Sequence, residues 1–203
     1  MISKPKMYDE IEVNQEFVPI SLGGHKGIIM SAEEYTSPVS GNTSLRVCVD
    51  TDKDDAQPNY FTDLYKNDTR EDKKWSNSAI KYVSLKEDEN CVRMLKAFIT
   101  AVENSNNGYT YDWGKDTSQL KGKKVGLNFG LEEYQDQDGE VRTATKLVQF
   151  RSLDKISDVK IPKVKLITGD FIDYEDYKNR SNKSTASSVV SNEEIENSLP
   201  FEI

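Results

Sequence analysis

The sequence is poor in the residues that build metal and redox sites. Its 203 residues include one histidine and two cysteines, Cys48 and Cys91, with no CxxC pair. A structural zinc site needs several Cys or His ligands at fixed spacing, so this composition argues against one. Both cysteines lie in apolar-patterned segments, which predicts buried free thiols in a reducing compartment. We therefore expect neither a metal nor a cofactor.

Long apolar runs and an excess of positive charge are also missing. No run of 18 apolar residues and no charged-then-apolar leader is present, which predicts neither a membrane span nor a signal peptide. The formal net charge is −8; residues 179–203 hold two basic and four acidic side chains, which leaves −6 for the rest. A globally basic nucleic-acid binder is excluded, so any nucleic-acid site has to be a local basic patch.

The last 25 residues are polar and then acidic, which predicts a flexible tail over 179–203. Apolar residues among its carboxylates predict a partner-binding end formed by Glu193, Glu194, Glu196, Leu199, Pro200 and Phe201. This end resembles the acidic C-terminal tip of bacterial single-stranded DNA-binding proteins, where a hydrophobic residue, Pro and Phe close the chain. Here Glu202 and Ile203 follow, so the terminal carboxylate does not belong to the Phe.

The remaining chain divides into a lead-in over 1–20 and one domain over 21–178. Period-2 patterns predict a hairpin from strands at 25–35 and 45–49, and a short third strand at 80–84. An Asp-Gly turn at 137–139 predicts a second hairpin, from strands at 124–131 and 140–152.

The helical pattern is clearest after the third strand. Ser84-Leu85-Lys86-Glu87 fits a capping box, and an apolar stripe follows it at three- and four-residue steps: Val92, Leu95, Phe98, Ile99 and Val102. A short helix is predicted near residues 60–66. Strand, strand, loop, strand, helix, strand, strand is the chain order of an OB-fold, a mainly β five-stranded barrel with a helix between strands 3 and 4. Another small α+β domain is the alternative.

Two segments combine the groups that single-stranded DNA requires. Aromatic faces stack on unpaired bases, worth about 1–3 kcal/mol per base, and cations follow the phosphates. Segment 57–82 interleaves both kinds of residue, and segment 141–165 carries a net charge of +5. Even numbering predicts that Arg142 and Lys146 share a strand face with Phe150. The DNA-binding candidates are Tyr60, Phe61, Tyr65, Lys66, Arg70, Lys73, Lys74, Trp75, Arg142, Lys146 and Arg151.

Each of these residues also has an ordinary structural interpretation. The aromatics of segment 57–82 can pin the loop to the body, and the lysines of either segment can form a solvated face. For the alternating Tyr109, Tyr111 and Trp113, a core or edge-strand role is expected. His25 lacks any matching nucleophile motif, and the acidic pairs near residues 132–138 lack the calcium-loop pattern. An enzyme is therefore not expected.

Three stretches resemble a phage-encoded family of single-stranded DNA-binding proteins from replication modules of phages that infect Gram-positive bacteria. They are Gly23-Gly24-His25 leading into Ala32-Glu33-Glu34-Tyr35; Asn67-Asp68-Thr69-Arg70 with Asp72-Lys73-Lys74-Trp75; and residues 122–126, 132–134, 139–143 and 150–152. The resemblance implies an OB-type barrel with a role in DNA replication or recombination in the bacterial host cytoplasm. It assigns no DNA-contacting residue.

The first hypothesis is a non-enzymatic single-stranded DNA-binding protein whose tail recruits replication or recombination proteins. The alternative is a protein-binding adaptor of the same module that does not bind DNA directly. A small nuclease is a third, disfavoured possibility. No membrane partner is expected, and exposed sheet edges make a homodimer plausible.

Overall fold

The computed structural model describes Lys4 and residues 18–180. Seven strands form one mixed, open sheet: β1 (Gly23–Thr36), β2 (Thr43–Thr51), β3 (Ile80–Ser84), β4 (Lys124–Gln135), β5 (Val141–Arg151), β6 (Val164–Lys165) and β7 (Phe171–Ile172). The strand order is β3-β2-β1-β4-β6-β7, and β5 pairs with β4 off this path. All pairings are antiparallel except that of β4 with β6. The prediction of a mainly β domain with helices is confirmed.

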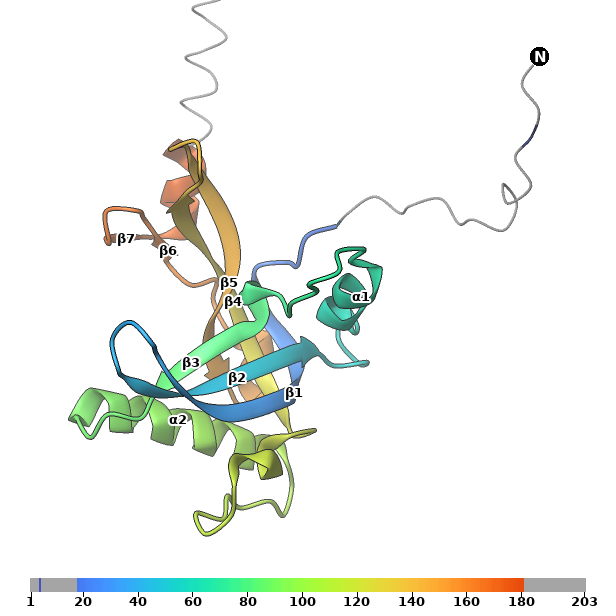
Figure 1. Cartoon of the computed structure of the whole chain (residues 1–203), viewed down its shortest axis with the longest axis vertical. Coiled ribbons are helices and arrows are strands. Elements are labelled where there is room, and N and C mark those ends of the chain that lie inside the picture. The colour runs from blue at the N-terminus through green and yellow to red at the C-terminus, as the bar shows by residue number, and fades with distance from the viewer. Residues whose placement is uncertain (1–3, 5–17, 181–203) are drawn as a thin grey trace, which may run out of the picture.

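Helices α1 and α2 and three short 3₁₀ segments accompany the strands, and residues 174–180, at the end of the described chain, are also helical. Helix α1 (Tyr60–Asn67) follows β2, and helix α2 (Glu89–Ser105) lies between β3 and β4, so both predicted helices are present. The 3₁₀ segments are η1 (Asn77–Ala79), η2 (Thr117–Leu120) and η3 (Leu153–Asp158). Figure 1 shows α2 running along the sheet beneath β2 and β3, while α1 and the β4–β5 hairpin project from the opposite side.

The sheet does not close into the five-stranded barrel that the sequence predicts. Helix α2 packs against β3, β4 and β5, and its Met94 and Phe98 line a small cavity of about 150 Å³ with side chains of β3 and β5. Strands β3 and β5 lie on either side of this cavity and do not pair. The two extra strands, β6 and β7, have only two residues each, too few to show a period-2 pattern.

The core lies between the inner face of the sheet and α2. The fully buried strand residues include Val47, Val49, Val125, Leu127 and Phe129. From α2, Phe98, Ile99 and Val102 are buried, as the apolar stripe predicts, but Val92 in its first turn is half exposed. The helix therefore rests on the sheet through its later turns.

The first turn of α1 depends on a carboxylate from the preceding strand. Buried Asp50 of β2 accepts hydrogen bonds from the backbone N–H groups of Phe61 (2.8 Å) and Thr62 (3.1 Å). The N-cap residue, Asn59, adopts a left-handed conformation with φ of 51° and makes no side-chain cap. A negative charge at a helix N-terminus satisfies its free N–H donors and complements the dipole. Asp50 thus fixes α1 against the end of β2.

Three glycines on the outer face of β1 and β4 allow the chain after β5 to lie directly on the sheet. A Cβ atom on Gly126 would lie 2.9 Å from the carbonyl oxygen of Arg151, and one on Gly130 would lie 3.0 Å from Pro162. A Cβ atom on Gly24 would overlap the carbonyl oxygen of Ile156. Because these positions carry no side chains, the chain that follows β5 packs against this face. We call this stretch, η3 together with residues 159–163, the connector.

Helix α2 begins at a different cap from the one predicted. Ser84 ends β3, and the N-cap is Asp88, whose carboxylate accepts the N–H of Cys91 at 3.0 Å. We expect Asp88→Ala to lower the free energy of unfolding by about 1 kcal/mol, since the cap is lost. Ser84→Ala is the matched control and should change it by less than about 0.5 kcal/mol. Urea denaturation of both variants measures this, and a larger loss for Ser84→Ala would contradict the assignment.

Candidate nucleic-acid interface

A β-bulge in β5 determines which of its side chains reach the surface. Phe129 of β4 pairs with Leu147 and Asn128 pairs with Gln149, so Val148 is an extra residue without a partner. The bulge reverses the alternation of the strand. Phe150 consequently enters the core, with its ring 4.6 Å from that of Phe98. The prediction that Phe150 shares a face with Arg142 and Lys146 is wrong.

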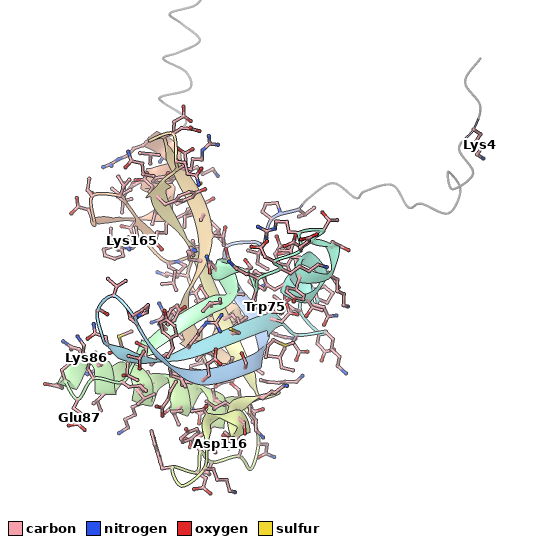
Figure 2. All side chains as sticks on the ribbon, viewed as in Figure 1. Lys4, Trp75, Lys86, Glu87, Asp116 and Lys165 are labelled. Atoms are coloured by element: carbon pink, nitrogen blue, oxygen red, sulfur yellow. The ribbon has the colours of Figure 1, made fainter. Side chains whose placement is uncertain are left out.

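The same bulge brings three predicted cations onto one face. Arg142, Lys146 and Arg151 pair with Tyr134, Gly130 and Gly126 of β4. Directly paired residues point to the same side of a sheet, and this is the outer side, where Gly126 and Gly130 lie under the connector. We call Arg142, Lys146 and Arg151 the β5 cation row. The ion pair of Lys165 with Glu132 (2.5 Å) lies beside this hairpin (Figure 2).

The aromatic residues of segment 57–82 mainly hold the loop in place. Phe61 is 2% exposed with its ring against Phe129, so the base-stacking role predicted for it is not available to a core residue. Tyr60 packs edge-on against it, and burial raises the pKa of the Tyr60 hydroxyl. Trp75 lies between α1 and the sheet (Figure 2), where its Nε1–H donates to the Val49 carbonyl at 3.1 Å.

Tyr65 is the most accessible aromatic of the loop between β2 and β3. It is 40% exposed, stands 5.9 Å from the Trp75 ring and has the Lys73 amine 5.9 Å from its own ring centre. Segment η1, at the end of the loop, packs on both β2 and β5. The loop is therefore connected to β5, which carries the cation row, through η1. Trp75 and Phe61 of the loop contribute to packing.

Most of the predicted cations pair with nearby carboxylates. Arg70 holds Asp68 at 2.7 Å, Lys66 lies 3.5 Å from Asp63, and Lys74 lies 3.7 Å from Asp72. Arg142 pairs with Asp136 and Glu140 in the hairpin turn. Within residues 18–180, no ion pair is found for the three remaining predicted cations, Lys73, Lys146 and Arg151. These three have the most charge available to a ligand.

Sequence reasoning missed an aromatic pair on the β1–β3 surface. Tyr35 and Tyr82 are 37% and 47% exposed, with ring centres 5.4 Å apart. Arg46 pairs with Tyr82 across β2 and β3 and binds Glu33 at 2.6 Å. The hydrogen bond to Glu33 raises the pKa of Arg46, and Tyr82 contributes to the same shift. The sequence signal for this surface was the alternation of polar residues with Leu45, Val47 and Val83, which are buried.

His25 is buried and structural in its contacts. Its Nδ1 lies 2.8 Å from Asp55 Oδ2, and its Nε2 lies 2.9 Å from Ser21 Oγ and 3.1 Å from the Ser21 carbonyl. Asp55 also accepts the N–H groups of Lys26 and Gln57. These residue types match a hydrolase triad, but Ser21 lines none of five cavities of the described chain. The cluster ties the start of the domain to the loop after β2.

The aromatic run after α2 forms no strand. Tyr109 and Tyr111 are partly buried against the core, and Trp113 is 71% exposed with its ring edge-on to Tyr111. Tyr109 and Tyr111 therefore contribute to the core as predicted, but they do so from an irregular loop. The predicted partner-binding residues Glu193 to Phe201 lie outside the described residues.

Comparison with known proteins adds no assignment: no family model matches the chain, and no curated protein matches it. Across residues 18–180, no group of three or more His, Cys, Asp or Glu side chains is placed to hold a metal ion. No helix in the described part of the chain is long and apolar enough to cross a membrane.

The fork between Arg70 and Asp68 provides a direct test of the charge pairing. Hydrogen bonds from the Arg70 side chain lower the pKa of Asp68 from 3.8 to about 2. This carboxylate therefore stabilises the fold above pH 3.8, and the contribution is lost as the pH falls toward 2. We expect Arg70→Ala to raise the Asp68 midpoint toward 3.8 in an NMR titration. Lys74→Ala should leave it unchanged; an unshifted midpoint in Arg70→Ala would show that the fork does not form.

Proposed function

We propose that this protein binds single-stranded DNA without catalysing a reaction on it. The observation that carries the proposal is the β5 cation row, Arg142, Lys146 and Arg151, aligned on one strand face in a chain with a net charge of −8. Lys146 and Arg151 have no ion-pair partner within residues 18–180, so the cost of binding a phosphate there is small. A row of cations on an extended strand can follow an extended nucleic-acid backbone.

Strand adjacency supports an OB-type assignment. Strands β3, β2, β1, β4 and β5 are neighbours in that order, and α2 connects β3 to β4. An OB-fold has this connectivity, and it binds oligonucleotides on the face of its second and third strands. Tyr82 and Arg46 lie on that part of the sheet, beside Tyr35. We propose that Tyr82 and Tyr65 stack on bases, with the β5 cation row holding phosphates.

The cellular setting follows from the family resemblance. We propose a role in phage DNA replication or recombination in the bacterial host cytoplasm, with residues 193–201 recruiting replication or recombination proteins. The open edge of β3, a strand of five residues, offers a place for a second copy of the chain.

A protein-binding adaptor is the second candidate, and the charge pairing favours it. Lys66, Arg70, Lys74 and Arg142 all bind carboxylates of their own chain. Phosphates would have to compete with these carboxylates for the cations. A partner protein could instead form hydrogen bonds with the existing ion pairs without breaking them. Direct titration with DNA separates the two candidates.

Affinity for oligo-dT should fall steeply with salt, because bound counterions are released. It should also exceed the affinity for a duplex of equal length, because only unpaired bases can stack on aromatic side chains. Replacing Lys146 and Arg151 together by Ala should reduce the slope of log K against log salt by about 0.7 per cation removed. Lys96→Ala, on the exposed side of α2, is the control and should leave the slope unchanged. Fluorescence anisotropy at several salt concentrations measures this. Equal binding to duplex, or no binding, would favour the adaptor.

Stacking on the β1–β3 surface predicts a second difference. Tyr82→Ala should weaken oligo-dT binding about 5- to 150-fold, since one stacked base is worth about 1–3 kcal/mol. Trp113→Ala removes a more exposed aromatic that belongs to none of the strands β1 to β3 and should have little effect. The same anisotropy titration compares both variants. A Tyr82→Ala variant that folds and binds like the parent chain would remove Tyr82 from the interface.

A further inference from the structure

The outer face of β4 and β5 contains a basic hollow. It has a volume of about 610 Å³ and lies between the two strands and the connector. Arg151, Lys155 and Lys160 line it against one acidic residue, Asp158. A hollow of this size accommodates one nucleotide, and its charge suits a phosphate.

Asn128 adds a specific polar group to the floor of the hollow. The residue is 3% exposed, and its Nδ2 donates to the Lys160 carbonyl at 3.3 Å. This bond fixes the amide orientation, because the opposite one would place two oxygens together. Oδ1 consequently faces away from the connector carbonyl and has no hydrogen-bond partner in the structure. A buried acceptor without a partner is unfavourable, so Oδ1 is a candidate to accept a hydrogen bond from a bound molecule.

These two features set two requirements for a ligand. The molecule must present an N–H donor to Asn128 and an anion to the surrounding cations. Gln149 pairs with Asn128 across the strands and lines the same hollow, so two side-chain amides lie together. Asn and Gln amides recognise the adenine edge, accepting from the exocyclic N6 amine and donating to N7. Thymine has only an N3–H donor between two carbonyl oxygens, which would face the acceptors.

We infer that the hollow binds an adenine nucleotide, with its N6 amine on Asn128 Oδ1 and its phosphate on Arg151, Lys155 and Lys160. Residues 159–163 belong to no helix or strand, and the Asn128–Lys160 hydrogen bond is long. Because Oδ1 is buried in the structure, the inference requires this part of the connector to shift outward when the base binds. The nucleotide is either one unit of a bound DNA strand or a free nucleotide with the same chemistry. The first case rests on the proposed function.

Binding of three oligomers tests the inference: oligo-dA, oligo-dT, and an oligomer in which unsubstituted purine replaces each adenine. Oligo-dA should bind about 5- to 100-fold tighter than both others, as expected for one bidentate base contact. Asn128→Leu, checked for folding by thermal melting, should abolish this preference. Lys155→Ala with Lys160→Ala should weaken all three equally, because phosphate contacts carry no sequence information.

The outcomes separate this inference from the proposed function. Salt-dependent binding of all three oligomers with equal affinity overturns the adenine site and leaves single-stranded DNA binding intact. Binding of free dAMP that Asn128→Leu abolishes, without oligomer binding, supports the site and overturns the proposed function. If neither dAMP nor any oligomer binds, both fall. The unsubstituted-purine oligomer removes the amine without altering the protein, so the test does not depend on the folding of Asn128→Leu.

Discussion

The bulge at Val148 is the constraint on which both the core and the candidate interface depend. A regular β5 could not place Leu147 and Phe150 on the inner face together, because they are separated by three positions. The extra residue allows both to be buried while Lys146, Gln149 and Arg151 face outward. The Phe98–Phe150 contact, which holds α2 to β5, and the alignment of the β5 cation row therefore have the same origin.

The surface chemistry depends on how charge is distributed within short stretches of chain. Lys66, Arg70 and Lys74 lie within a few residues of the aspartates that they bind, so this loop offers little free positive charge. Strand β5 has no acidic residue between Val141 and Arg151, and no ion pair is found for Lys146 or Arg151 within residues 18–180. Local sequence thus determines which cations a phosphate can use, and an acidic protein can retain a basic strand face.

Periodic segments were predictable from the sequence because burial repeats in them. The two hairpins, α2 and the third strand follow such patterns, whereas the short helix near residues 60–66 was predicted without one. Other features depend on contacts distant in sequence. Asp50 rather than a local residue supports the start of α1, and Asp88 is favoured over Ser84 because β3 continues to Ser84. Phe61 enters the core because α1 is held against β2. The bulge was hidden, because Leu147-Val148-Gln149-Phe150 is compatible with either alternation.

The glycines of the outer face link the fold to the hollow. Side chains on Gly24, Gly126 and Gly130 would hold the connector away from the sheet, and Lys155 and Lys160 would then lie far from Arg151. Close approach places a backbone carbonyl over Asn128, which engages one end of its amide and leaves the other without a partner. The position of Asn128 between two glycines of β4 is therefore consistent with recognition. Packing alone would be served by a third glycine or a small apolar residue.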